Sequence, residues 1–192
     1  MESFAGCALS ASSLFIEWKY SLVTTAAGSG FSRWGDLELT RWRADPTLDN
    51  CGSWIYVEDR LSGRLWSVAN QPTMIPADRS ETHFYPHRVE FERQDGEIVL
   101  RTTVTVAPED DVEIRRVTVT NHGDHSRQLA LTSYAEIILS QQSVDQRHPA
   151  FNKLFVESEF LPRENLLIFR RRPRSADEKP VYLAHFFTSN HE

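Results

Sequence analysis

The chain has 192 residues, of which 40% are hydrophobic and 11% aromatic, and a formal net charge of −6. This length suits one domain or a piece of a larger protein, and the apolar content is enough for a packed core, which excludes a disordered chain. The negative charge argues against nucleic acid as a partner. The two distant cysteines, Cys7 and Cys51, form neither a disulfide framework nor a metal cluster, so we expect a reducing compartment and no metal or other cofactor.

Alternation of apolar and polar residues dominates the chain and predicts β-strands. Asp95-Gly96 separates two alternating runs and is a strong hairpin signal. The apolar phase slips near Arg115-Arg116, which predicts a β-bulge there. The predicted strands cover residues 53–58, 63–67, 87–92, 98–106, 112–119, 129–139, 153–160, 166–171 and 181–187.

The spacing of these strands, with no long helical period, indicates an all-β fold, an antiparallel β-sandwich. We assign residues 18–192 to this domain and leave residues 1–17 unassigned. The last strand ends close to residue 192, so we expect the domain to be truncated at its carboxyl end. The start of the chain is a poor signal peptide and no apolar stretch is long enough to span a membrane, so we expect no direct membrane insertion.

All five tryptophans lie between Trp18 and Trp66. We expect Trp54 in the sandwich core, and Trp18 could pack there as well. Residues 28–50 are different, because tryptophans alternate with charged side chains and two glycines open the segment. We interpret this segment as a long functional loop. Aromatic planes and guanidinium–carboxylate groups together suit the apolar face and the hydroxyls of a sugar ring.

Other candidate groups have simpler explanations. Glu157 and Glu159 share one strand face at about 7 Å, a spacing also found in inverting glycosidases, but such pairs usually mark a solvated strand face. His83 and His87 would lie about 13 Å apart on a strand, too far for one metal ion. The run 109–111 is acidic and lacks the alternating spacing of a calcium loop. We therefore predict no catalytic residue and no metal ligand.

A series of short runs keeps an unbroken order along the chain: residues 21–34, 40–49, 52–56, 65–67, 71–73, 108–118, 131–136, 148–151 and 154–159. These runs resemble cyclic β-1,2-glucan synthases, which are related to the cellobiose and chitobiose phosphorylases once grouped as glycosyltransferase family 36 (now glycoside hydrolase family 94). The likeness extends over about residues 20–187, whereas residues 1–17 look unrelated.

The resemblance implies an N-terminal β-supersandwich of the galactose-mutarotase-like kind, followed in the family by a catalytic (α/α)6 barrel that is absent here. It implies a non-catalytic module of a glucan synthase or glycoside phosphorylase, in the cytoplasm as a soluble part of a larger membrane-anchored bacterial enzyme. The expected partners are β-glucan oligosaccharide, bound at about millimolar affinity, the barrel, and a second copy in a homodimer. The alternative is an interface module that docks the barrel or a second subunit without binding sugar itself.

The predicted binding residues fall into three roles in the segment 28–50. Two tryptophans would stack on sugar rings, three arginines would donate to hydroxyls or phosphate, and three aspartates would accept hydrogen bonds or support the arginines. A third hypothesis, an autonomous glycosidase, would use Glu157 and Glu159. The eight residues are Trp34 and Trp42, Arg33, Arg41 and Arg43, and Asp36, Asp45 and Asp49.

Overall fold

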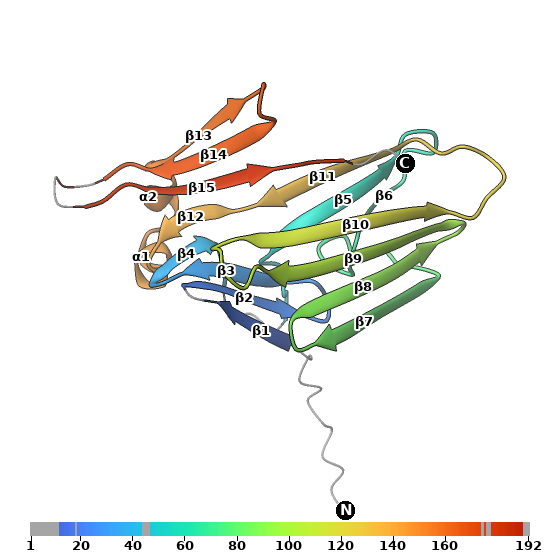
Figure 1. Ribbon diagram of the computed structural model, residues 1–192, viewed down its shortest axis with the longest axis horizontal. Helices are drawn as coiled ribbons and strands as arrows, with labels where there is room; N and C mark the ends of the chain where they lie inside the picture. The colour runs from blue at the N-terminus through green and yellow to red at the C-terminus, as the bar shows by residue number, and fades with distance from the viewer. Residues whose placement is uncertain (1–11, 18, 44–46, 174, 176–177, 190–192) are drawn as a thin grey trace, which may run out of the picture.

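The computed structural model describes residues 12–17, 19–43, 47–173, 175 and 178–189 (Figure 1). Its strands form four antiparallel sheets, as alternation predicts, and two short helices interrupt them. Sheet A has the order β1-β2-β3-β4-β12, and sheet C has the order β10-β9-β8-β7. Sheet B has the order β11-β5-β6, and sheet D has the order β13-β14-β15.

Sheets A and B together hold eight strands. Sheet A consists of β1 (Ser12–Glu17), β2 (Tyr20–Thr25), β3 (Gly30–Trp34), β4 (Leu37–Thr40) and β12 (Ile137–Ser140). Sheet B consists of β5 (Ser53–Asp59), β6 (Leu65–Ser67) and β11 (Leu129–Ala135). Strand β1 begins before the boundary predicted at residue 18 and pairs with β2 along its whole length.

Sheets C and D hold the remaining strands. Sheet C consists of β7 (Arg79–Tyr85), β8 (Arg88–Asp95), β9 (Ile98–Val106) and β10 (Glu113–Asn121). Sheet D consists of β13 (Val156–Leu161), β14 (Leu166–Arg171) and β15 (Val181–Phe186). The helices α1 (Gln142–Arg147) and α2 (Pro149–Lys153) lie between β12 and sheet D.

Two hydrophobic clusters fill the sandwich, and sheet C contributes to both. Cluster 1 joins Leu22 and Leu39 of sheet A to Val104 of β9. Cluster 2 joins Val57 and Trp66 of sheet B to the other half of β9. Sheets A and B therefore lie side by side as one layer, which sheet C covers as the second layer (Figure 1). Trp54 is buried, as predicted.

The hairpin predicted at Asp95-Gly96 is confirmed, and Gly96 adopts the positive φ that this turn requires. Gly30 is needed for another reason: a Cβ at this position would lie 1.9 Å from the Val23 carbonyl oxygen on the adjacent strand. Only glycine lets β2 and β3 approach this closely.

The predicted β-bulge near Arg115-Arg116 is wrong. Strands β9 and β10 pair without a register shift from Glu113 to Asn121. The apparent slip arises because polar residues occupy inward positions of β10. The Glu113 carboxylate accepts hydrogen bonds from the Tyr20 and Ser32 hydroxyls of sheet A, at 2.9 and 2.5 Å. Although burial opposes it, Arg115 and these hydroxyls hold the pKa of Glu113 below its ordinary value.

The strand predicted at residues 129–139 is two strands. Strand β11 pairs with β5 in sheet B, and after Glu136 the chain enters β12 and pairs with β4 in sheet A. The register of β12 shifts between Ile137 and Ser140, where Leu139 has a φ of 47°. Apolar and polar residues continue to alternate where the chain passes from sheet B to sheet A, so the sequence alone did not reveal the break between the two strands.

Candidate functional site

The segment predicted as one long loop, residues 28–50, is largely a hairpin. Residues 30–34 form β3 and residues 37–40 form β4. The alternation is hidden in the sequence because the inward position of β3 between Gly30 and Trp34 is a serine rather than an apolar residue. Ser32 is buried, its hydroxyl donates to Glu113, and its backbone N–H donates to the Thr40 hydroxyl at 2.9 Å.

The pleat of β3 sends the two neighbours Arg33 and Trp34 to opposite faces of sheet A. Trp34 lies on the inner face, where its partly buried ring packs against cluster 1. Its Nε1 donates to Asp111 Oδ2 at 2.6 Å, and the Lys19 Nζ atom lies 5.3 Å from the centroid of its ring. Trp34 is thus engaged within the chain.

Arg41 is also engaged within the chain. Its side chain is buried, and Nε and Nη2 donate to the two carboxylate oxygens of Asp145 at 2.8 Å each. Nη1 pairs with Glu136 as well. These hydrogen bonds and charges raise the pKa of Arg41, and they hold the pKa of Asp145 below its ordinary value although burial opposes this. The Asn152 amide extends the network from Asp145 to the Ser140 hydroxyl.

The outer face of the hairpin carries an aromatic pair. The rings of Phe31 and Trp42 are tilted by 40° with centroids 5.2 Å apart, and both residues are half-buried. Arg43 follows and is exposed. Asp49 is half-buried, and its carboxylate accepts a 3.3 Å hydrogen bond from the Thr25 hydroxyl, so it anchors the end of this segment. Asp45 lies outside the described residues.

A polar pocket of about 250 Å³ lies at the tip of the same hairpin, against the start of α1. Arg33 and Asp36 line it and form a loose ion pair of 3.6 Å. The remaining lining residues are Glu38, Gln141, Gln142 and Ser143. Arg33 and Glu38 are cross-strand partners, so both point to the outer face. Because Phe31 is two residues from Arg33, the aromatic pair and the pocket lie about 7 Å apart along β3.

Glu38 is the unusual residue of this pocket. It is only 5% exposed, and among the described residues none donates a hydrogen bond to its carboxyl group. Burial raises the pKa of Glu38 to about 7; the Arg33 charge opposes this shift and the Asp145 charge adds to it. A buried carboxyl facing a pocket without a partner is a strong candidate for ligand contact. Sequence reasoning missed it because Asp36 and Glu38 have the spacing of an ordinary solvated strand face.

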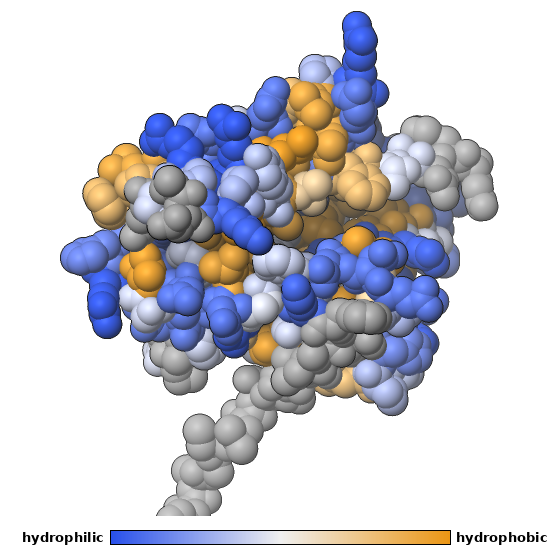
Figure 2. Space-filling view, turned by 60° about the vertical axis from the view of Figure 1, so that its left-hand side comes forward, coloured by the Kyte–Doolittle hydropathy of each residue, from blue (hydrophilic) through white to orange (hydrophobic). Residues whose placement is uncertain are grey.

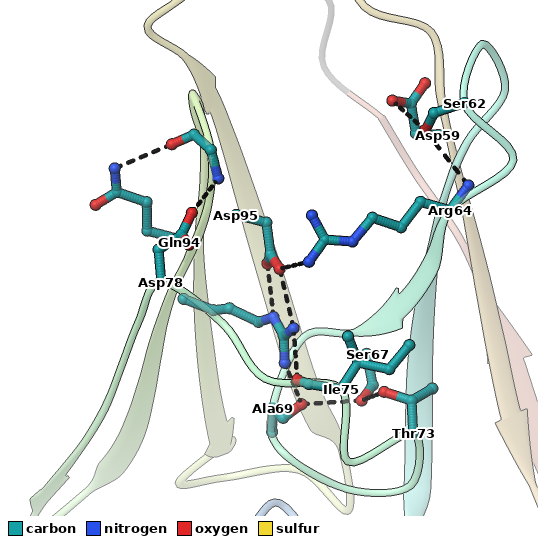
Figure 3. Close-up of polar contacts among 12 residues, drawn as sticks. Asp59, Ser62, Arg64, Ser67, Ala69, Thr73, Ile75, Asp78, Gln94 and Asp95 are labelled. Carbon is teal, nitrogen blue, oxygen red and sulfur yellow. Dashed lines mark hydrogen bonds and ion pairs between the residues drawn. The ribbon is translucent and has the colours of Figure 1, made fainter.

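A second polar cluster has a structural role (Figure 3). The Arg93 guanidinium and the Asp95 carboxylate are buried and form a bidentate pair at 2.7 and 3.0 Å. Arg93 also donates to the carbonyls of Ala69 and Ile75, and Arg64 approaches Asp95 at 3.1 Å. This cluster fastens the segment after β6 to sheet C. A hollow of about 360 Å³ borders Arg93, but the polar groups of this buried residue are already bonded.

The carboxylate and histidine groups singled out in the sequence are dispersed. Glu157 pairs with Arg170 at 2.6 Å and with Arg172 at 3.3 Å, and Glu159 is exposed. His83 lies on β7, whereas His87 lies in the following turn.

One group of metal-ligating type occurs among the described residues. It consists of Glu81, His83 and Glu92, whose ligand atoms lie within 4.8 Å of one another. The two carboxylates are already paired with Arg79 and Arg101.

Two facing antiparallel layers with a polar pocket on the outer side define a β-sandwich protein of the supersandwich class. Residues 11–192 match the family described as "Glycosyl hydrolase 94, supersandwich domain", and the chain belongs to this family. The resemblance found in the sequence is thereby confirmed.

Three relatives support the assignment. Over 89% of the chain it is 34% identical to "Cyclic beta-(1,2)-glucan synthase NdvB" of Rhizobium meliloti (strain 1021), covering 6% of that protein. Over 68% of the chain it is 28% identical to "N,N'-diacetylchitobiose phosphorylase" of Vibrio proteolyticus and 25% identical to that of Vibrio furnissii, covering 17% of each. The chain thus spans a small part of each relative. Within the described residues, no helix has the length and apolar character needed to cross a bilayer.

Proposed function

We propose that this chain is a non-catalytic carbohydrate-binding module of a larger glucan synthase or glycoside phosphorylase. The observation that carries the proposal is the outer face of the β3–β4 hairpin, where the Phe31–Trp42 pair and the polar pocket lie side by side. An aromatic surface next to hydrogen-bonding side chains suits a sugar, whose rings have apolar faces and polar edges. The names of the relatives also refer to saccharides, β-(1,2)-glucan and N,N'-diacetylchitobiose.

The proposed surface consists of Phe31, Arg33, Asp36, Trp42 and Arg43. Trp42 supplies the stacking ring, and the exposed Arg43 donates to hydroxyls at its edge. Trp34 and Arg41 are left out, because their polar groups are engaged by Asp111 and Asp145. A single stacking ring contributes about 0.5–1.5 kcal/mol beyond area burial, so we expect about millimolar affinity.

Titration of β-1,2-glucan oligosaccharides, followed by tryptophan fluorescence, tests this function. We expect a saturable change in the parent chain and loss of most of it in Trp42→Ala, because that variant removes the stacking ring. Trp34→Phe is the matched control, since Trp34 lies on the inner face, and it should keep the response. A chain that does not respond at tens of millimolar sugar would contradict the proposal.

A second candidate function is docking of the catalytic part of the same polypeptide. It is favoured by apolar side chains exposed at one end of sheet D. Phe160 is 56% exposed and lies opposite Leu167, whereas Phe186 is 61% exposed and lies opposite Leu166, so each face of this end carries one exposed ring. Figure 2 shows apolar side chains gathered near the top of the molecule, the level at which β13–β15 lie in Figure 1. Exposed apolar patches commonly mark interaction surfaces. Co-expression with the remainder of the parent protein tests this: stable association that Phe160→Ser with Phe186→Ser abolishes would support docking.

A further inference from the structure

The pocket at the tip of the β3–β4 hairpin is built from two distant parts of the chain. Arg33, Asp36 and Glu38 come from the hairpin, whereas Gln141, Gln142 and Ser143 come from the start of α1. Their side chains offer donors and acceptors in a small space, but only one of them, Glu38, is buried. A volume of about 250 Å³ is below that of sites for drug-sized ligands, which begin at roughly 300 Å³. It suits one sugar ring rather than an oligosaccharide.

We propose that this pocket is a binding subsite for a single neutral sugar unit, in which the Glu38 carboxylate accepts a hydrogen bond from a ring hydroxyl. The inference rests on the proposed function and specifies where one unit of the glucan binds. Arg33 and the two glutamine amides would bond the other hydroxyls, and Phe31 and Trp42 would contact the adjoining unit about 7 Å along β3.

The charges around Glu38 favour a neutral ligand. Arg33 on β3 and Asp36 in the turn face the pocket as a loose pair of opposite charges. From α1, the charge of Asp145 helps to raise the pKa of Glu38, but its carboxylate is bonded to Arg41. No single charge therefore dominates the opening, whereas a hydroxyl can supply the hydrogen bond that the Glu38 carboxyl lacks among the described residues.

Binding of such a hydroxyl should depend on pH. In the free chain, burial keeps Glu38 largely protonated below neutral pH. A hydroxyl that donates to the carboxylate stabilises its ionised form, because charge-assisted hydrogen bonds are roughly twice as strong as neutral ones. Binding should therefore release a proton near pH 7, and affinity should rise about tenfold between pH 6 and pH 8.

Isothermal titration and NMR chemical-shift titration with sophorose, the β-1,2-linked glucose disaccharide, test the subsite at pH 6 and pH 8. We expect tighter binding at pH 8 and proton release, seen as a dependence of the heat on the buffer. Glu38→Gln should lower the affinity at pH 8 and flatten the pH dependence. Glu159→Gln, at an exposed carboxylate of β13, is the matched control and should leave both unchanged.

A second variant tests the pocket independently, in case Glu38→Gln impairs folding. Ser143→Leu places an apolar side chain at the exposed rim of the pocket and should weaken sophorose binding at both pH values. Binding that keeps its strength and pH dependence in Glu38→Gln and Ser143→Leu, yet is lost in Trp42→Ala, would overturn the subsite and leave the proposed function standing. No binding by the parent chain at either pH would contradict both.

Discussion

At the scale of single residues, Glu38 is a carboxyl group in an environment that favours its neutral form. Folding raises the pKa of Glu38 from an ordinary value of about 4.3 to about 7 because the side chain is buried. The folded chain therefore keeps a proton that the unfolded chain releases between these values. The resulting contribution to stability is complete below about pH 4 and is lost as the pH rises through 7.

We predict that the free energy of unfolding falls by about 2 kcal/mol more between pH 5 and pH 8 in the parent chain than in Glu38→Gln. The glutamine keeps the shape of the side chain and cannot ionise, so the difference between the two profiles isolates this group from the histidines. Urea unfolding followed by circular dichroism at several pH values measures it. Parallel profiles for the two proteins would show that Glu38 is already ionised at pH 5.

The position of a residue in the sheet, rather than its type, decides which aromatic and basic side chains are available to a ligand. Arg33 and Trp34 are neighbours in the sequence, yet one lies on the outer face and the other on the inner face of sheet A. Arg41 and Arg43 differ in the same way: Arg41 is 8% exposed and bonded to two carboxylates, whereas Arg43 is exposed. Composition drew attention to the segment that carries the proposed surface, but it could not assign a face to each side chain.

At the scale of elements, the Arg41–Asp145 ion pair holds the helical segment α1–α2 against sheet A. The side chains are 9% and 5% exposed, and the pair joins the end of β4 to α1. Neither helix is longer than six residues, so neither is stable without tertiary contacts. Asn152 of α2 bonds Asp145, Ser140 and Arg171, which extends the same network to β12 and sheet D.

We predict that Asp145→Asn costs about 3–5 kcal/mol of stability, because it leaves the buried Arg41 charge without its main partner. Hydrogen exchange should accelerate first in residues 141–153, since these residues lose their attachment. Arg33→Gln is the control: its ion pair with Asp36 is long and exposed, so the cost should stay below about 1 kcal/mol. Equal costs for the two variants would contradict a structural role for the network.

Strands were predicted best where the alternation of apolar and polar residues marks a single buried face of the strand. Strands β8 and β9 were expected from residues 87–106, and their buried phase, including Val89, Ile98 and Leu100, is the expected one. The bulge predicted in strand β10 is absent because Glu113 and Arg115 occupy inward positions. Helices α1 and α2 were missed because they are one or two turns long and have no apolar stripe that a periodic pattern could show.

At the scale of the whole molecule, sheet C connects the two hydrophobic clusters. Val104 belongs to cluster 1 and Ile98 and Leu100 belong to cluster 2, yet all three lie on β9. Because β9 contributes to both clusters, loss of its packing in one cluster also weakens its packing in the other. The sandwich should therefore unfold as one cooperative unit.

We predict a single unfolding transition that both clusters control. Leu22→Ala in cluster 1 should cost about 2–5 kcal/mol, and Val57→Ala in cluster 2 about 2 kcal/mol. Both should lower the same midpoint, whether it is followed by tryptophan fluorescence or by far-ultraviolet circular dichroism. Two separate transitions, each sensitive to only one of the variants, would show that sheets A and B unfold independently.

The sequence by itself determined the all-β class, the hairpin at Asp95-Gly96, the buried phase of β9 and the family, because alternation, turn residues and ordered motifs are local properties of the chain. Only the tertiary structure decided which face of sheet A each side chain of the 28–50 segment occupies. It also decided that Glu38 meets residues 141–143 in a pocket and that Arg41 is bonded to Asp145. These contacts join residues about a hundred positions apart, and the free energy that selects them comes from burial and pairing across the fold rather than from any local pattern.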